Sequence, residues 1–158
     1  MPQQQQLDYT YLEMANTWGQ LSKARRKKVG CLIVKNNQII SDGYNGTPAG
    51  YDNDCEFETR SGWKTRPEVL HAESNALMKL AKSTNSSKDS TIYLTMSPCF
   101  DCAKLIIQAG VIRVVYSEKY RNQEGIKFLR SNNVIAERVT IPDVRTISAI
   151  HDSCGYDC

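Results

Sequence analysis

Two short segments of the sequence carry residues that can bind a metal ion and transfer protons. Residues 71–73 read His-Ala-Glu, and residues 97–102 read Ser-Pro-Cys-Phe-Asp-Cys. Together they supply one imidazole, His71, and two thiols, Cys99 and Cys102. Three protein ligands are typical of a catalytic zinc, which keeps a fourth position open, whereas a structural zinc is usually closed by a fourth ligand. Water in the open position ionises near neutral pH, so hydroxide would be available.

The sequence around both segments predicts that helices begin there. Ser97 is a favoured N-cap residue and Pro98 is favoured at the first helical position. This would place Cys99 and Cys102 three residues apart on one helix face, near the positive end of the helix, which stabilises thiolates. Glu73 starts another run with helical apolar spacing, and its position leaves its carboxylate free to transfer protons rather than bind the metal.

Each part of this pattern also has a simpler explanation. A Cys-x-x-Cys pair occurs in redox proteins, and a single histidine is often a packed core residue. The combination of His71, Glu73, Pro98 and both cysteines is far more specific than its parts and favours the zinc site. Because a structural zinc has no use for Glu73, the carboxylate favours a catalytic site.

Length and composition limit the class of protein. The 158 residues suit one domain, which can bury a core without disulfide bonds. We expect a single domain over residues 1–158, with its core in residues 8–140 and an unassigned tail in residues 141–158. No apolar run reaches the length of about 18 residues that a membrane helix needs. The N-terminus lacks the basic and apolar regions of a secretory signal, so we expect a cytoplasmic protein without a membrane partner.

The six cysteines are expected to be metal ligands or buried thiols, because disulfides are rare inside cells. Cys31 lies in an apolar run and is expected in the core, whereas Cys55 has no assigned role. The tail contains His151, Cys154 and Cys158. They would suit a second metal site or a terminus with incidental cysteines.

The net charge of +3 does not suggest a surface that wraps a nucleic acid, and we expect no stable nucleic-acid partner. One basic cluster nevertheless stands out, and it consists of Lys23, Arg25, Arg26, Lys27 and Lys28. The solvated end of a helix, a phosphate site and a nucleic-acid patch all fit such a cluster.

The remaining sequence predicts the elements that would position these residues. Apolar spacing predicts helices over residues 8–24 (with Asp8 as N-cap), 70–82, 98–109 and 126–132. Short apolar runs predict strands over residues 29–34, 38–44, 91–95, 111–116 and 134–139. Residues 51–67 show no clear periodicity and predict a long loop. This order predicts an α/β fold in which one mixed sheet has helices on its faces.

With these motifs placed, the chain resembles the deoxycytidylate (dCMP) deaminases of phages and bacteria, in the cytidine deaminase superfamily. The pattern His-x-Glu…Pro-Cys-x-x-Cys is shared by zinc-dependent nucleobase deaminases. The sequences Gly-Tyr-Asn-Gly-Thr-Pro at residues 43–48 and Ala-Lys-Leu-Ile-Ile-Gln-Ala-Gly at residues 103–110 narrow the resemblance to the dCMP branch. The resemblance runs from about Leu12 to Val139.

The resemblance implies a three-layer α/β/α fold with one mixed five-stranded sheet, and the hydrolysis of dCMP to dUMP and ammonia. It also implies a homohexamer that dCTP with Mg²⁺ activates and dTTP inhibits. One catalytic Zn²⁺ per subunit would be held by His71, Cys99 and Cys102, with Glu73 as general acid and base. Some phage relatives hold a second zinc with histidines before the His-Ala-Glu motif, and this chain has none there.

The same resemblance assigns residues to the nucleotides. Asn45 would face the pyrimidine or the sugar, and Tyr120, with Lys119 or Arg121 beside it, would hold the phosphate. The implied substrate-binding residues are Asn45, Ser97, Lys119, Tyr120 and Arg121. The implied effector-binding residues, near subunit contacts, are Lys23, Arg25, Arg26, Lys28, Asn45 and Gly46.

Other functions share parts of the pattern. A tRNA adenosine deaminase or a single-stranded DNA deaminase has the same zinc ligands, although it is expected to show a broader basic face. A nucleotide-binding regulatory module with a structural zinc belongs to a different class. Turnover of dCMP rather than of an RNA stem-loop would separate these functions.

Overall fold

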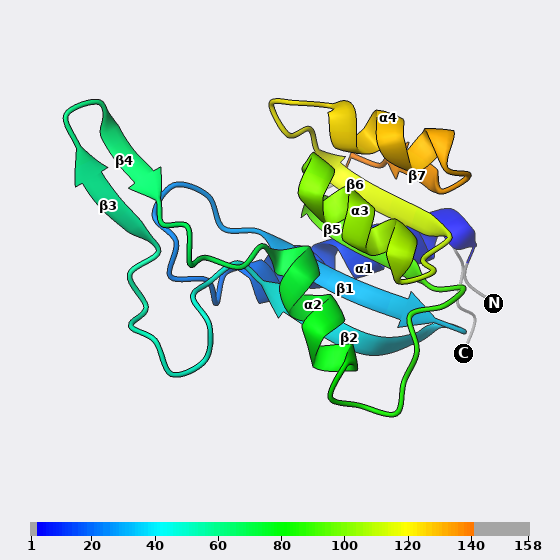
Figure 1. Ribbon diagram of the computed structural model, residues 1–158. Helices are drawn as coiled ribbons and strands as arrows, with labels where there is room; N and C mark the ends of the chain where they lie inside the picture. The colour runs from blue at the N-terminus through cyan, green and yellow to red at the C-terminus, as the bar shows by residue number, and fades with distance from the viewer. Residues whose placement is uncertain (1–2, 141–158) are drawn as a thin grey trace, which may run out of the picture.

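A mixed five-stranded sheet lies at the centre of the structure, a computed structural model that describes residues 3–140 (Figure 1). The sheet has the order β2-β1-β5-β6-β7. Its strands are β1 (Gly30–Lys35), β2 (Gln38–Tyr44), β5 (Thr91–Met96), β6 (Arg113–Glu118) and β7 (Ile135–Arg138). Strand β1 is antiparallel to β2 and β5, whereas β5, β6 and β7 are parallel. The tail with His151, Cys154 and Cys158 lies outside the described residues.

Helices cover both faces of this sheet. They are α1 (Gln4–Gly19), α2 (Ala72–Leu80), α3 (Phe100–Gln108) and α4 (Glu124–Ser131). Because successive strand residues point to opposite faces, Leu32 and Val34 of β1 pack with α1, whereas Cys31 and Ile33 pack with α2 and α3. The three-layer α/β/α fold with a mixed five-stranded sheet is therefore confirmed, and Cys31 lies in the core.

The prediction for the first helix was wrong at both ends. Helix α1 begins at Gln4, so Asp8 lies within it, 4% exposed, rather than at its N-cap. The helix ends at Gly19, where the backbone passes so close to Gly30 that a Cβ on Gly19 would lie 2.8 Å from the Gly30 nitrogen. The basic cluster at residues 23–28 therefore lies on a loop, and the explanation of this cluster as a helix end is wrong.

The long loop predicted over residues 51–67 contains a second, separate sheet. Strands β3 (Glu56–Thr59) and β4 (Gly62–Thr65) pair antiparallel and project away from the central sheet (Figure 1). The turn between them requires Gly62, which has a φ of +109°. Most residues of both strands are exposed, so the hairpin lacks the alternation of buried and exposed residues that reveals a half-buried strand.

Smaller differences affect the ends of other elements. Strand β6 begins and ends two residues later than the predicted 111–116, and α4 begins two residues before the predicted start at 126. None of the helices within residues 3–140 is long and apolar enough to cross a membrane.

Candidate active site

The two sequence motifs meet where the N-terminal ends of α2 and α3 lie beside the carboxyl end of β5. His71 is the N-cap residue of α2 and Cys99 is the N-cap residue of α3, with Cys102 in the first turn. The prediction that Ser97 caps the helix was therefore wrong. The N–H of Ser97 donates to the Glu118 carbonyl (2.8 Å) and extends the pairing of β5 with β6. Because Ser97 belongs to this pairing, α3 begins only at Phe100.

Three metal-binding atoms converge at this point. The Nδ1 atom of His71 lies 3.5 Å from the sulfur of Cys99 and 3.4 Å from that of Cys102. The three ligand atoms all lie within 4.8 Å of one another, and they form the one such cluster in residues 3–140. This donor set fits zinc, because soft sulfur and nitrogen ligands suit this ion and three of them leave a position open.

The two thiols are joined by a hydrogen bond that shifts their pKa values in opposite directions. This bond and the one to His71 outweigh burial and lower the pKa of Cys99 to about 4. The same bond, together with burial, raises the pKa of Cys102 far above its ordinary value. A metal ion bound to both sulfurs would hold both as thiolates.

Glu73 lies in the first turn of α2, 4% exposed. Burial raises the pKa of its carboxyl to about 7, although its own backbone N–H and the nearby His71 act in the opposite direction. A carboxyl group with a pKa near the working pH both accepts and donates protons readily, as general acid–base catalysis requires.

Two glycines allow the backbone to bring these groups together. A Cβ on Gly43 of β2 would lie 2.3 Å from the Ala72 carbonyl oxygen, so α2 begins in direct contact with the strand. A Cβ on Gly125 of α4 would lie 2.3 Å from the Pro98 carbonyl oxygen. Both contacts fix the position of a metal-binding segment, and neither leaves space for a side chain.

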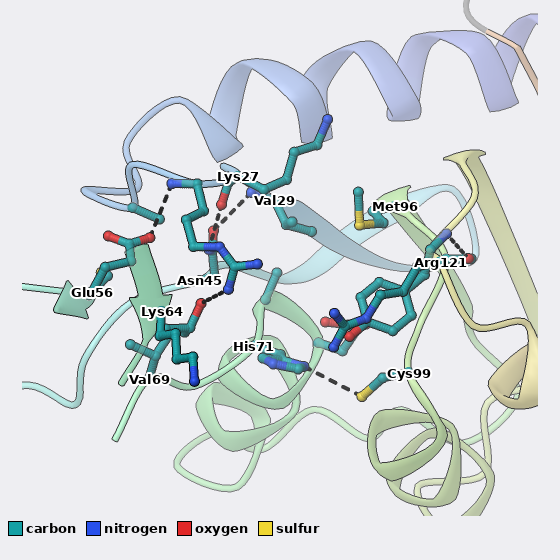
Figure 2. Close-up of a pocket in the computed structure, with 18 residues that line it drawn as sticks. Lys27, Val29, Asn45, Glu56, Lys64, Val69, His71, Met96, Cys99 and Arg121 are labelled. Atoms are coloured by element: carbon teal, nitrogen blue, oxygen red, sulfur yellow. Dashed lines mark hydrogen bonds between the residues drawn. The ribbon is translucent and has the colours of Figure 1, made fainter. Parts of the chain in front are cut away.

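A cavity of about 710 Å³ opens above the metal-binding cluster (Figure 2). This volume lies within the range of about 300–1,000 Å³ that is usual for small-molecule sites. Its lining includes the three groups His71, Glu73 and Cys99 and a set of charged or polar residues, namely Arg26, Lys27, Asn45, Glu56, Lys64, Thr65, Ser97, Tyr120 and Arg121.

The structure brings most of the expected substrate-binding residues to this cavity. Asn45, Ser97, Tyr120 and Arg121 line it, whereas Lys119 does not. The side chain of Asn45 is occupied by the backbone, since its oxygen accepts from Val29 N–H (2.8 Å) and its nitrogen donates to the Lys27 carbonyl (2.8 Å). The Ser97 hydroxyl accepts from Tyr120 N–H (2.7 Å) and thereby holds that segment against the site.

The expected effector residues are not gathered in one place. Arg26 and Asn45 line the cavity, whereas Lys23, Arg25, Lys28 and Gly46 do not. The Arg25 guanidinium lies over the Trp63 ring (4.8 Å to the centroid), and Lys28 donates to the Gln20 carbonyl. Gly46 forms an isolated bridge with Leu70, just before the metal-binding histidine.

Sequence reasoning missed the contribution of the β3–β4 hairpin. Glu56, Lys64 and Thr65 all line the cavity, as does Cys55, which is buried just before β3. Residues 51–67 contained a local signal for the turn but none for the strands, because the Ser61-Gly62 dipeptide, typical of turns, lies between the end of β3 and the start of β4.

Comparisons with known proteins agree with this geometry. Residues 5–118 match the family model described as the cytidine and deoxycytidylate deaminase zinc-binding region. The deoxycytidylate deaminase of Enterobacteria phage T4 is 35% identical over 155 residues, which covers 73% of this chain and 80% of the relative. The human deoxycytidylate deaminase is 36% identical over 121 residues, covering 72% of this chain and 66% of the relative.

A solved structure shows the same likeness in three dimensions. The dCMP deaminase from the cyanophage S-TIM5, in complex with dCMP and dUMP, superimposes with a TM-score of 0.81 at 42% identity. The match covers 87% of this chain and 100% of that chain.

Proposed function

The chain belongs to the cytidine and deoxycytidylate deaminase family, and on this premise we propose that it hydrolyses dCMP to dUMP and ammonia. The proposal is supported by the 42% identity to a dCMP deaminase whose structure holds dCMP and dUMP. The observation that carries it is the convergence of one imidazole and two thiols beside a buried carboxyl at the base of a nucleotide-sized cavity.

His71, Cys99 and Cys102 would hold a zinc ion. When bound, the zinc supplies the Lewis acidity that makes water a nucleophile at neutral pH. Two of the three ligands, His71 and Cys99, line the cavity, so a zinc ion held by them would be accessible from it.

Glu73 is the proton carrier of the proposed reaction. Its carboxylate takes a proton from the attacking water, and the resulting carboxylic acid delivers a proton to N3 of the cytosine ring. The carboxylate then takes the second proton of the water, from the hydroxyl group now on C4, and passes it to the amino group, so that the C4–N bond breaks and ammonia leaves as the C4 carbonyl forms. The pKa of about 7 suits this double role, because both protonation states are populated near neutral pH.

The remaining lining residues are proposed to orient the nucleotide. Asn45 holds the backbone of residues 27–29 against the cavity and would present that wall to the pyrimidine or the sugar. Ser97 fixes Tyr120 through its hydrogen bond, and the Arg121 guanidinium lies 5.6 Å from the Tyr120 ring centroid. Lys119, which lies outside the lining, would act on the phosphate only at a distance.

Regulation and assembly also form part of the proposal. The resemblance of the sequence motifs supports a homohexamer that dCTP with Mg²⁺ activates and dTTP inhibits. Lys23, Arg25, Arg26, Lys28, Asn45 and Gly46 are the proposed effector residues. A site that joins them would include surfaces outside the cavity, because only two of them line it.

A substrate panel tests the proposed function. Zinc-loaded protein is given dCMP, CMP, deoxycytidine, dCTP and an RNA stem-loop, while loss of the cytosine chromophore and release of ammonia are followed. Preferential turnover of dCMP is expected, with activation by dCTP and inhibition by dTTP. Turnover of dCMP without an effector response would refute the proposed regulation and leave the proposed reaction in place. The proposed reaction would be contradicted if the zinc-loaded protein deaminated the RNA, or if it deaminated none of these compounds.

A further inference from the structure

Residues 47–69, which include the β3–β4 hairpin, leave the rest of the protein and return to it at one narrow place. Gly46 and Leu70 form an isolated antiparallel bridge, in which the backbone N–H of each residue donates to the carbonyl of the other (3.1 and 2.8 Å). Between these two residues the chain forms a flap, residues 47–69, whose hairpin projects away from the central sheet (Figure 1). The flap ends just before the metal-binding His71.

The flap is held together by its own contacts, most of which involve Arg66. The backbone N–H of Arg66 donates to the Cys55 carbonyl (2.9 Å). Its guanidinium donates to the Asp52 carboxylate (2.6 Å) and to the Asp54 carbonyl (2.9 Å). Within residues 3–140, the ion pairs of flap residues all involve Arg66 and stay inside the flap. The flap can therefore move as one body.

Few contacts hold the flap against the rest of the protein. In the part of the chain that the structure describes, no flap residue belongs to either buried apolar cluster, and large apolar side chains such as Phe57 and Trp63 are exposed. The hydrogen bonds that the flap forms with other described residues all join it to Arg25 and Arg26. A segment with so few buried apolar contacts opens at low cost in free energy.

The Glu56 carboxylate makes the strongest of these contacts. It is buried at the start of β3 and accepts from the backbone N–H of Arg25 (3.0 Å to each oxygen) and of Arg26 (3.2 Å). Hydrogen bonds to an ionised acceptor are about twice as strong as neutral ones. Beside them, the Arg26 guanidinium donates to the Thr65 hydroxyl (3.1 Å), and the Arg25 guanidinium lies over the Trp63 ring (4.8 Å).

The cavity lies between the flap and the rest of the protein. The flap supplies one wall, which consists of Cys55, Glu56, Lys64, Thr65 and Val69. Figure 2 shows Glu56 and Lys64 on one side of His71, and Cys99 and Arg121 on the other. A molecule that fills this cavity contacts both walls, and it therefore favours the closed arrangement over an open one.

We propose that the flap opens about the Gly46–Leu70 bridge to admit the substrate and release the product, and that Glu56 holds it closed. The motion follows from the contacts of the flap, and only the identity of the molecule that enters rests on the proposed function. Closing would exclude water from the site around Glu73, and opening would set the rate at which the product leaves.

Two reporters detect the opening directly. The chain has two tryptophans, so Trp18→Phe leaves Trp63 alone, and acrylamide quenching of its fluorescence measures how far Arg25 uncovers the ring. Hydrogen exchange of the Arg25 and Arg26 amides measures release of Glu56, which accepts from both. In zinc-loaded protein, dUMP should lower the quenching. At ten times its Kd it should slow exchange at both amides by about tenfold.

Two matched variants test the role of Glu56. Glu56→Gln keeps the side-chain length but removes the charge, so exchange at Arg25 and Arg26 and the release of dUMP in stopped-flow experiments should become about 10- to 100-fold faster. The KM for dCMP should rise accordingly. The Gly46 and Leu70 amides should exchange as in the wild type, which separates opening of the flap from a general loss of structure.

Glu58→Gln is the control, because it makes the same chemical change at an exposed position of β3 outside the cavity, and it should behave as the wild type. The inference is overturned if dUMP changes neither reporter in protein that deaminates dCMP, or if Glu56→Gln releases dUMP at the wild-type rate. Protein that neither binds dUMP nor deaminates dCMP would refute the proposed function instead. The flap is then tested without a ligand, and equal quenching of Trp63 in the Glu56→Gln and Glu58→Gln variants would overturn it.

Discussion

Replacement of Asp8 by alanine should destabilise the fold strongly, because this carboxylate is the centre of a buried polar network. It accepts from both terminal nitrogens of Arg113 (2.8 and 2.7 Å), from the Tyr93 hydroxyl (2.7 Å) and from Gln4 (2.9 Å). Loss of one partner from a buried ion pair costs about 3–5 kcal/mol. The Arg113 side chain is 18% exposed and would still form its ion pair with Glu137 in the variant. We therefore expect the free energy of unfolding to fall by about 2–3 kcal/mol, which is less than the full cost of breaking a buried pair.

The effect should also depend on pH. Burial raises the pKa of Asp8, but hydrogen bonds from Arg113, Tyr93 and Gln4 outweigh burial and hold it below the ordinary value of 3.8. A carboxyl group with a lowered pKa in the folded protein stabilises the fold above its unfolded pKa. That contribution is lost as the pH falls through the folded pKa. The difference in the free energy of unfolding between wild type and variant should therefore reach its full value at pH 7 and decrease below about pH 4.

Urea unfolding followed by circular dichroism measures this effect. With a typical slope of about 1–3 kcal/mol per molar urea, the midpoint should fall by about 0.7–3 M at pH 7. Glu13→Ala is the matched control, since it removes an exposed carboxylate from the same helix and should change stability by less than about 0.5 kcal/mol. Equal midpoints for the two variants, or a difference that persists at low pH, would refute this account of the network.

Three further predictions concern the active site. Glu73→Gln should keep its zinc and bind dUMP, yet lower kcat by about 10²–10⁴-fold; normal turnover would show that this residue is not the proton carrier. Cys99→Ala should lose zinc, as elemental analysis would show, and retention of one zinc per chain would exclude this ligand. Gly125→Ala should weaken zinc binding in a competition assay with a chromogenic chelator, because the new Cβ would lie 2.3 Å from the Pro98 carbonyl oxygen. Wild-type affinity in that variant would mean that α4 does not position the metal-binding segment.

The zinc ligands and the central fold could be predicted because their signals are local. His71, Glu73 and the two cysteines stand at fixed spacings in short segments, and β1 and β5 read as apolar strands. The two predicted helix starts, at residues 71–73 and 97–102, were enough to predict that the ligands lie together. The cap of the second helix was not predicted correctly, because Ser97 belongs to the end of the strand pairing.

The parts that could not be predicted depend on contacts between distant residues. Asp8 resembles an N-cap residue until Arg113, 105 positions away, is seen to pair with it. The hairpin at residues 56–65 is held to the basic loop by Glu56, whose partners are backbone groups that no side-chain pattern reveals. The position of Lys64 in the lining of the cavity was missed for the same reason, because it depends on this packing.

A titration of metal-free protein with zinc, during which dUMP formation from dCMP is measured, tests most directly whether zinc at this site drives the reaction. Because residues 3–140 contain one cluster of three ligands, which would leave a position open on a bound zinc, the rate should rise linearly and level off at one active-site zinc per chain. Ammonia and dUMP should appear in equal amounts. Full activity without zinc, or none at one bound zinc per chain, would contradict the assignment of this site as a zinc-dependent dCMP deaminase.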